Sequence, residues 1–216
     1  MGSNYYFLCI DLNMGGQCGM DLPSVVDKVK TLLCGYSSVA KCVSMFKVTG
    51  ESKIIAVFNV SNVIGLERII SGLARMDNIG TKCQPVVLYE KFAMKSLGVD
   101  ENLGKPCDNN VTKAKQIFWL EFNVEYHGKS SEEFLATWKR EAEFALGAKA
   151  SGVCLDLYKV VAERKVHLLI VMEPEDLNDL AFNLPLMKEN GNNTTITTRS
   201  AQSLDDYCSR ISSESI

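Results

Sequence analysis

The sequence has few of the residues on which metal and redox sites depend. It contains only two histidines, and its eight cysteines include no Cys-x-x-Cys pair and no close pair matched to two histidines. A structural zinc site needs four such ligands close together, and a thioredoxin-like site needs the Cys-x-x-Cys spacing. We therefore predict no metal site and no cofactor. We expect reduced thiols, because several cysteines lie within apolar runs, where free Cys behaves as a small hydrophobic residue.

Long apolar runs and an excess of positive charge are also missing. No stretch of about 18 apolar residues is present, which excludes a membrane-spanning helix. The formal net charge is −3 and the sequence has no cluster of Lys and Arg residues, so we do not expect electrostatic binding to the phosphate backbone of nucleic acids. The N-terminus lacks the basic start and small-residue cleavage site of a secretory signal. These absences predict a soluble, cytoplasmic protein that binds neither membranes nor nucleic acid.

What the chain does contain is one pattern written twice, roughly 110 residues apart. In both 53–76 and 165–187, a Lys opens an aliphatic run, a polar break follows, and a short amphipathic segment comes next. The spacing indicates a duplicated domain rather than a short-period repeat. The correspondence continues upstream, where Phe46-Lys47-Val48 matches Tyr158-Lys159-Val160 and Asp11-Leu12-Asn13 matches Glu121-Phe122-Asn123.

The first copy is predicted from hydrophobic periodicity and capping residues. Its expected elements are a strand at 5–12, a helix from 22, strands at 39–49 and 53–60, a helix at 62–75, a strand at 82–90 and a short helix at 91–97. The glycine-rich segment 13–20 lacks the Lys-Ser/Thr of a phosphate-binding loop, so we interpret it as a flexible loop or a lid.

The second copy repeats the order after a polar segment, 98–114, that is rich in turn-forming residues and serves as a linker. Ser130 and Glu133 form a predicted capping box at the start of its first helix. The expected elements are a strand at 116–124, a helix at 131–147, strands at 153–161 and 165–172, a helix at 174–183, a strand at 194–199 and a short final helix. The predicted domains are therefore 1–97 and 115–216.

Each copy thus has the order β-α-β-β-α-β, which is the ferredoxin-like unit of the α+β class. Such a unit carries both helices on one face of an antiparallel sheet, and the other face needs a cover. The second copy is the obvious cover. We predict two tandem ferredoxin-like repeats that pair within the chain, with their sheets packed face to face as an intrachain α+β barrel. Further homo-oligomers are compatible with this arrangement.

Three short segments resemble the muconolactone isomerase-like proteins of the dimeric α+β barrel superfamily. Segment 58–63, Phe-Asn-Val-Ser-Asn-Val, resembles the family's third strand and the start of its second helix. Segment 184–187 is similar to its Leu-Pro-Leu-Phe, and segment 157–160 to its Leu-Trp-Arg-Ile strand. The resemblance implies the barrel fold and a cofactor-free isomerase as one function. The chain departs from the family pattern at Asp156, where the family has His, and at Tyr158, where it has Trp. A shared fold would therefore not imply that this chain catalyses the isomerase reaction.

Strand alternation places Trp119, Glu121 and Asn123 on one face, and Asp11 and Asn13 on the matching face of the first copy. Two carboxylates close to a pseudo-twofold axis could transfer protons, because crowding or burial raises one pKa. Alternatively, these residues form a hydrogen-bonded polar layer or end in solvent. On the functional interpretation, Glu121 is catalytic and the other four line a ligand pocket.

Three further residues of the second copy are candidates for catalysis. Asp156 and Tyr158 share a strand face and, with the Trp119 ring, would suit a small planar or carbonyl-bearing ligand. His167 stands where the first copy has Ile55, and an imidazole can titrate near neutral pH. Each has a structural alternative, namely inter-sheet packing for the first two residues and a satisfied buried residue for the histidine.

On the first helix of the second copy, Trp138, Glu141 and Ala145 are helical neighbours, and we expect Trp138 in the core. Three functions remain open. The chain could be a small-ligand-binding or scaffold protein, which we rank first. It could be an isomerase-like enzyme acting on a small carbonyl- or lactone-type substrate. It could also be a regulatory sensor similar to amino-acid-binding ferredoxin-like modules.

Overall fold

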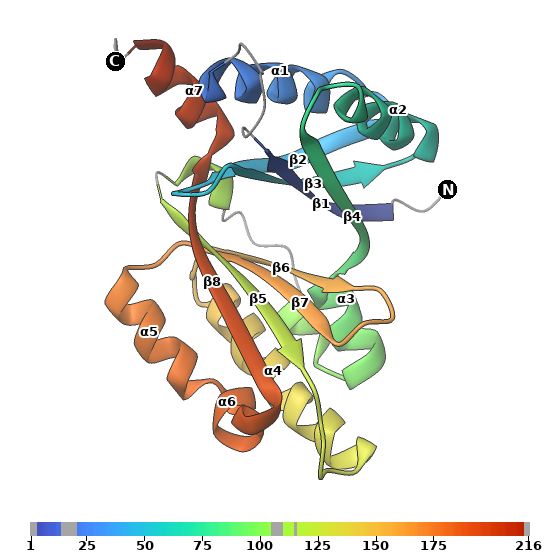
Figure 1. Ribbon diagram of the computed structural model, residues 1–216. Coiled ribbons are helices and arrows are strands. Elements are labelled where there is room, and N and C mark those ends of the chain that lie inside the picture. Colours follow the sequence, from blue (N-terminus) through green and yellow to red (C-terminus); the bar gives the residue numbers. More distant parts are fainter. Residues whose placement is uncertain (1–3, 14–20, 105–109, 115, 214–216) are drawn as a thin grey trace. The chain divides into compact units, whose positions relative to one another are not determined.

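The computed structural model describes residues 4–13, 21–104, 110–114 and 116–213 (Figure 1). Except for Asn13, the predicted lid 13–20 lies outside the described residues. By packing, the chain divides into two compact units. Unit 1 combines Met1–Val86 with Ser200–Ile216, and unit 2 is Val87–Arg199. The predicted domain limits at 97 and 115 stay a prediction, because packing units need not coincide with sequence repeats.

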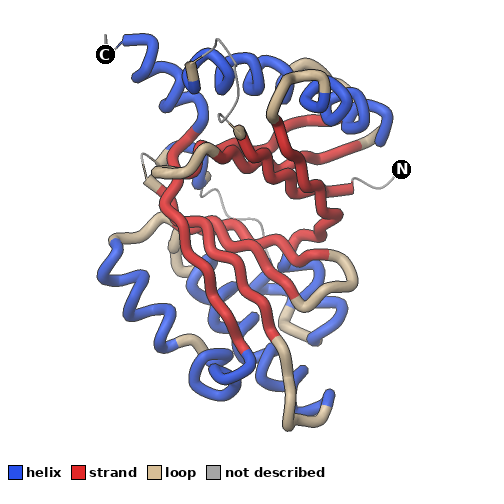
Figure 2. Tube along the Cα trace, in the orientation of Figure 1, coloured by secondary structure: helices blue, strands red, loops and turns tan. Residues whose placement is uncertain are grey.

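Unit 1 holds the first β-α-β-β-α-β series. Strand β1 pairs antiparallel with both β3 and β4, and β3 also pairs with β2, which gives the order β4-β1-β3-β2. The helices α1 and α2 lie on one face of this sheet (Figure 2). The elements are β1 (Asn4–Leu12), α1 (Leu22–Cys34), β2 (Ala40–Val48), β3 (Lys53–Val60), α2 (Val63–Ala74) and β4 (Ile79–Leu88).

The C-terminal segment completes unit 1. Strand β8 (Thr194–Ser203) ends beside β2, where Phe46 faces Ser203, and α7 (Leu204–Ser213) follows it. Leu204 is fully buried in the same core as the apolar face of α1. The predicted strand 194–199 is therefore too short, because its last residues gain hydrogen bonds from β2.

Unit 2 holds the second series. Strand β7 pairs antiparallel with both β5 and β6, and α4, α5 and α6 share a buried core with this sheet. Helix α3 and a π-helical turn, Ala93–Leu97, precede it, and 3-10 turns occur at Glu101–Gly104 and Val111–Lys113 within the predicted linker. The elements are α3 (Tyr89–Phe92), β5 (Ile117–Val124), α4 (Ser131–Ala150), β6 (Leu155–Val160), β7 (Lys165–Ile170), α5 (Pro174–Asn183) and α6 (Pro185–Asn190).

Local signals account for most of the helix starts. The predicted capping box is confirmed: Ser130 accepts from the Glu133 N–H, and Glu133 accepts from the Ser130 N–H. Asp21 caps α1 by accepting from the Ser24 N–H at 2.9 Å. The sequence did not predict α6. Leu184 is extended and Pro185 begins a new helix, as proline favours the first helical position.

The eight strands are hydrogen-bonded in the order β1-β3-β2-β8-β5-β7-β6-β4, and the last of them pairs with the first. The pairing is that of a closed eight-stranded antiparallel barrel, which confirms the predicted α+β class. Tandem duplication and face-to-face packing of the two sheets stay predictions. No helix among the described residues is long and apolar enough to cross a membrane.

Candidate functional site

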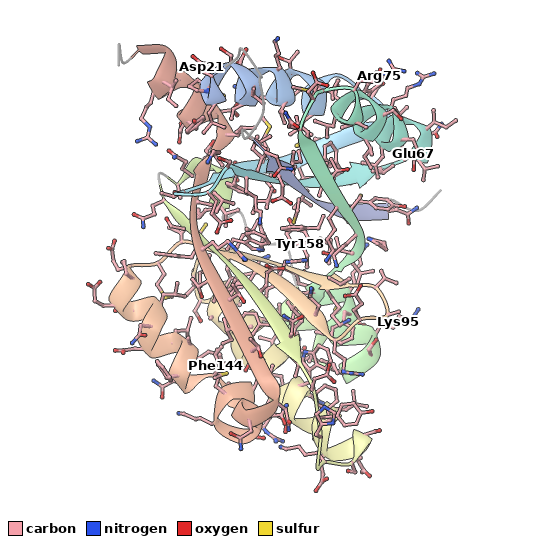
Figure 3. The ribbon with its side chains drawn as sticks, in the orientation of Figure 1. Asp21, Glu67, Arg75, Lys95, Phe144 and Tyr158 are labelled. Atoms are coloured by element: carbon pink, nitrogen blue, oxygen red, sulfur yellow. The ribbon has the colours of Figure 1, made fainter. Side chains whose placement is uncertain are left out.

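Unit 2 contains a cavity of about 90 Å³ between its sheet and its helices, here called the unit 2 cavity. One wall is the sheet face that alternation predicted to lie under the helices, including Leu120 and Phe122 of β5 and Leu168 of β7. The other walls come from α4, α5, α6 and Tyr89 of α3. Phe144 of α4 borders the cavity, whereas Tyr158 of β6 projects from the other face of the sheet (Figure 3).

Small side chains leave this space open. Ala145 and Ala148 of α4 and Ala181 of α5 line the cavity at places where longer side chains would reach toward the sheet. The remaining lining is aliphatic or aromatic, apart from the carboxyl of Glu141 and the polar ends of Tyr89 and Trp138. A cavity of this composition favours an apolar ligand that carries few polar atoms.

Glu141 brings a carboxyl group into the apolar cavity. The residue is 6% exposed, and its Oε2 accepts a hydrogen bond from the Leu186 backbone N–H at 3.1 Å. Burial raises the pKa of Glu141 to about 7, although the Leu186 hydrogen bond acts in the opposite direction. This carboxyl group therefore exchanges its proton near neutral pH, which is where a general acid or base is most effective.

Tyr89 supplies a second polar group. It is 2% exposed, and its hydroxyl oxygen accepts a hydrogen bond from Trp138 Nε1 at 3.0 Å. Burial, and to a smaller degree the charge of Glu141, raises the pKa of Tyr89, so the phenol stays protonated at neutral pH. Within the described part of the chain, the hydroxyl hydrogen of Tyr89 has no acceptor, which leaves it available to a ligand.

The opposite face of the unit 2 sheet carries several of the predicted site residues. Trp119 Nε1 donates to His167 Nδ1 at 3.3 Å, and His167 Nδ1 lies 3.8 Å from Glu121 Oε2. The strand register places His167 opposite both Glu121 and Tyr158. The structure thus brings His167, which was selected because it replaces Ile55 of the first copy, next to Trp119, Glu121 and Tyr158, which were selected from strand alternation.

Arg199 of β8 belongs to this group and was missed by sequence reasoning. It donates to Glu121 Oε1 at 2.8 Å, and its guanidinium lies 4.8 Å from the centre of the Trp119 ring. The predicted strand 194–199 contains Arg199, but no sequence signal shows which strand lies beside it. The group Trp119, Glu121, His167 and Arg199 is called the Trp119 cluster below.

The other predicted residues have different surroundings. Asp156 lies 3.4 Å from Lys149 Nζ, which also pairs with Glu90 at 2.7 Å. Burial raises the pKa of Asp156, and Lys149 opposes that shift. Asn123 is exposed at the end of β5.

Asp11 and Asn13 belong to unit 1. Asp11 pairs with Lys53 at 3.3 Å, and the Asn13 N–H donates to the Asn78 carbonyl at 2.8 Å. The pocket that Asp11 and Asn13 were predicted to share with Trp119 and Asn123 stays a prediction. Across the described ranges, no three His, Cys, Asp or Glu side chains gather as metal ligands.

No protein-family model matches this sequence, and no curated protein matches it. Solved structures do match over nearly the whole chain. Chlorite dismutase from Candidatus Nitrospira defluvii in complex with imidazole is 11% identical, with a TM-score of 0.60, over 96% of this chain and 94% of that one. A mutant of the same enzyme gives 12% identity and a TM-score of 0.63 over the same shares.

A further solved structure is a heme-binding protein from Thermus thermophilus. It is 13% identical, with a TM-score of 0.61, and the match covers 97% of this chain and 94% of that chain. At such identities the likeness shows the fold alone. It supports the α+β barrel class and carries no reaction across to this chain.

One of these proteins binds heme, and a heme in the unit 2 cavity would need a ligand for its iron. Heme iron is held by His, Cys, Met or Tyr. No His or Cys lines the cavity, and Tyr89 is a protonated phenol bonded to Trp138. Met172 is the one residue of the cavity lining that could still act as a ligand of heme iron. The volume of about 90 Å³ is also below the roughly 150 Å³ of a cavity that holds benzene. The residues present do not fit a heme.

Proposed function

We propose that this protein binds a small, largely apolar molecule in the unit 2 cavity. The observation that carries the proposal is a cavity of about 90 Å³ whose apolar lining includes a carboxyl group, that of Glu141. Apolar cavities in proteins take up hydrophobic molecules such as benzene. The polar atoms of Tyr89 and Glu141 would fix the orientation of the ligand.

The size of the cavity limits the ligand. The cavity of about 90 Å³ must widen toward roughly 150 Å³ before it can hold a small ring such as benzene. Phe144 lines the cavity and is 42% exposed, so its ring lies between the cavity and solvent. A change of the Phe144 rotamer would enlarge the cavity and admit the ligand.

Filling the cavity tests this function. Benzene is expected to raise the melting temperature of the wild type, because a ligand that binds only the folded state stabilises it. Ala145→Phe places a ring in the cavity and should abolish that increase. Ala136→Phe adds the same ring to an exposed position of α4 and should keep it. Melting temperatures with and without benzene provide the measurement.

Ala145→Leu places a smaller side chain in the cavity and can replace Ala145→Phe in this experiment if the phenylalanine variant does not fold. A wild type that benzene does not stabilise would contradict the proposed function. An Ala145→Leu or Ala145→Phe variant that responds to benzene as strongly as the wild type would contradict it equally.

We also infer that the two halves of the chain descend from one duplicated unit. The first half has the element order β-α-β-β-α-β, and the second half repeats it with one further helix, α6, before its last strand. Two buried lysines at matched positions support the inference further. Lys47 Nζ donates to the carbonyls of Val48 and Glu51, and Lys159 Nζ donates to those of Val160 and Glu163.

The isomerase-like alternative stays a prediction. It assigns acid–base roles to Glu121, Asp156, Tyr158 and His167. The proximity of Glu121 and His167 is compatible with those roles, but it equally suits a hydrogen-bonded structural layer. The resemblance to muconolactone isomerase-like proteins and the sensor function are likewise predictions.

A further inference from the structure

We infer that the unit 2 cavity selects a neutral ligand with one carbonyl oxygen, which the hydroxyl of Tyr89 and the carboxyl of Glu141 hold together. This inference rests on the proposed function, because it concerns the same cavity. It adds the chemical class of the ligand and the atoms that recognise it.

The hydrogen bonds already made within the cavity leave two groups for a ligand. The Trp138 N–H is occupied by Tyr89, and Glu141 Oε2 receives the Leu186 N–H. Among the described residues nothing accepts the Tyr89 hydroxyl hydrogen, and Glu141 Oε1 makes no hydrogen bond. The Tyr89 hydroxyl and Glu141 Oε1 are therefore the polar atoms that a ligand in this cavity can engage.

Both groups can act as donors. The phenol of Tyr89 is a donor at all physiological pH values. Glu141 has a pKa of about 7, so below neutrality its carboxyl group carries a proton and can donate as well. A carbonyl oxygen has two lone pairs and can accept from both groups. Two donors in an apolar, water-poor site bind such an oxygen more strongly than they would in water.

Charge excludes carboxylate ligands. No Lys or Arg is among the residues that line the cavity. Lys159 lies over the rings of Phe92 and Trp138, at 5.1 and 5.5 Å from their centres, and its Nζ is bonded to backbone carbonyls. An anionic ligand would therefore be buried without a counter-charge and, above neutral pH, beside the Glu141 carboxylate.

The pH dependence of binding follows from Glu141. Tyr89 is the other titratable residue that lines the cavity, and it stays neutral. Glu141 loses its proton as the pH rises through about 7, and one of the two donors becomes an acceptor. Binding of a carbonyl ligand should weaken above this pH, whereas binding of an alcohol should become stronger.

Two ligands of equal shape separate recognition of the oxygen from filling of the cavity. Cyclohexanone carries a C=O group at the position where methylenecyclohexane carries a C=CH2 group of similar size. Tyr89→Phe is expected to weaken cyclohexanone binding about tenfold, the equivalent of one hydrogen bond, and to leave methylenecyclohexane binding unchanged. Tyr126→Phe, a hydroxyl deletion outside the cavity lining, should affect neither ligand. Calorimetric dissociation constants at pH 6 and pH 8.5 provide the measurement.

Glu141→Gln keeps an N–H donor at every pH, so cyclohexanone should bind this variant equally at pH 6 and pH 8.5. Glu141→Leu provides the same readout as Tyr89→Phe if the latter does not fold. Equal weakening of both ligands by Tyr89→Phe, or pH-independent cyclohexanone binding to the wild type, would overturn the carbonyl assignment. Tighter binding of cyclohexanol than of cyclohexanone at pH 6 would overturn it too. If neither ligand nor benzene binds, the proposed function itself fails.

Discussion

Glu141 has a carboxyl group that is buried among apolar side chains with a single backbone hydrogen bond. Removal from water disfavours its charged form, and no cation in the cavity lining compensates. Such a group normally reduces stability, and its place in this cavity supports the ligand-binding function that we propose.

The same burial predicts how stability depends on pH. The folded state holds the Glu141 proton up to pH about 7, whereas the unfolded chain releases it near 4.5. Between these values the folded state binds more protons, so the free energy of unfolding falls as the pH rises, by about 3 kcal/mol over the window. Glu141→Gln should remove this decrease. Urea unfolding at pH 4.5 and pH 8 measures it.

Glu132→Gln changes an exposed carboxyl in the first turn of the same helix and should leave the pH dependence intact. The same pH dependence in Glu141→Gln and in the wild type would show that another group controls it.

Strand alternation predicted the Trp119 cluster only in part. It placed Trp119 and Glu121 on one face, because residues two positions apart in a strand point to the same side of the sheet. It could not identify Arg199, which reaches Glu121 from 78 residues away. The sequence also placed Glu141 next to Trp138, but burial and the raised pKa depend on elements that pack over the helix.

Helix α2 packs tightly against the start of β2. A Cβ atom built on Gly65 would lie 2.5 Å from Val39 Cγ2 and 3.2 Å from the Ala40 Cβ. Gly147 in α4 has no atom within 4 Å of such a Cβ. These two helical glycines therefore differ in packing, although intrinsic propensity treats them alike.

Alanine at the two positions should act in opposite directions. Gly147→Ala should raise the free energy of unfolding by about 0.5–1 kcal/mol, because alanine loses less backbone entropy on folding. Gly65→Ala should lower it by about 1–3 kcal/mol, since Val39 and Ala40 must move. Chemical denaturation measures both. Stabilisation by both substitutions would contradict this prediction, because it would show that Val39 and Ala40 can move away from residue 65 at little cost in free energy.

Element starts followed local rules more closely than element ends did. The capping box of α4 was predicted because its two residues lie within one turn of the helix they begin. The extension of β8 to Ser203 depends on hydrogen bonds to β2, which lies far away in the sequence. Helix α6 was missed because segment 184–187 was matched only to the Leu-Pro-Leu-Phe of another family, whereas Pro185 starts a helix.

Each unit has a core of its own. The buried residues of one core all come from unit 2, and those of the other come from unit 1 and include Leu204 of α7. The first unit is therefore discontinuous in sequence, because its core needs a residue from the C-terminal segment.

Truncation of Leu204 should destabilise unit 1 selectively. Leu204→Ala removes a fully buried side chain, which costs about 2–5 kcal/mol. Amide hydrogen exchange should accelerate in α1 and β2 and stay unchanged in α4 and β5. Leu146→Ala, in the unit 2 core, should have the reverse effect. Uniform acceleration in both variants would show that the two cores unfold together.

The order of the strands, the order of the helices other than α6, and the α+β class were readable from the chain. They depend on side chains one to four positions apart, and that spacing is present in the sequence itself. The unit 2 cavity, the protonation of Glu141 and the partners of the Trp119 cluster were not readable. They depend on which distant segments pack together and on the space that small residues such as Ala145 leave unfilled, and only the folded chain decides that.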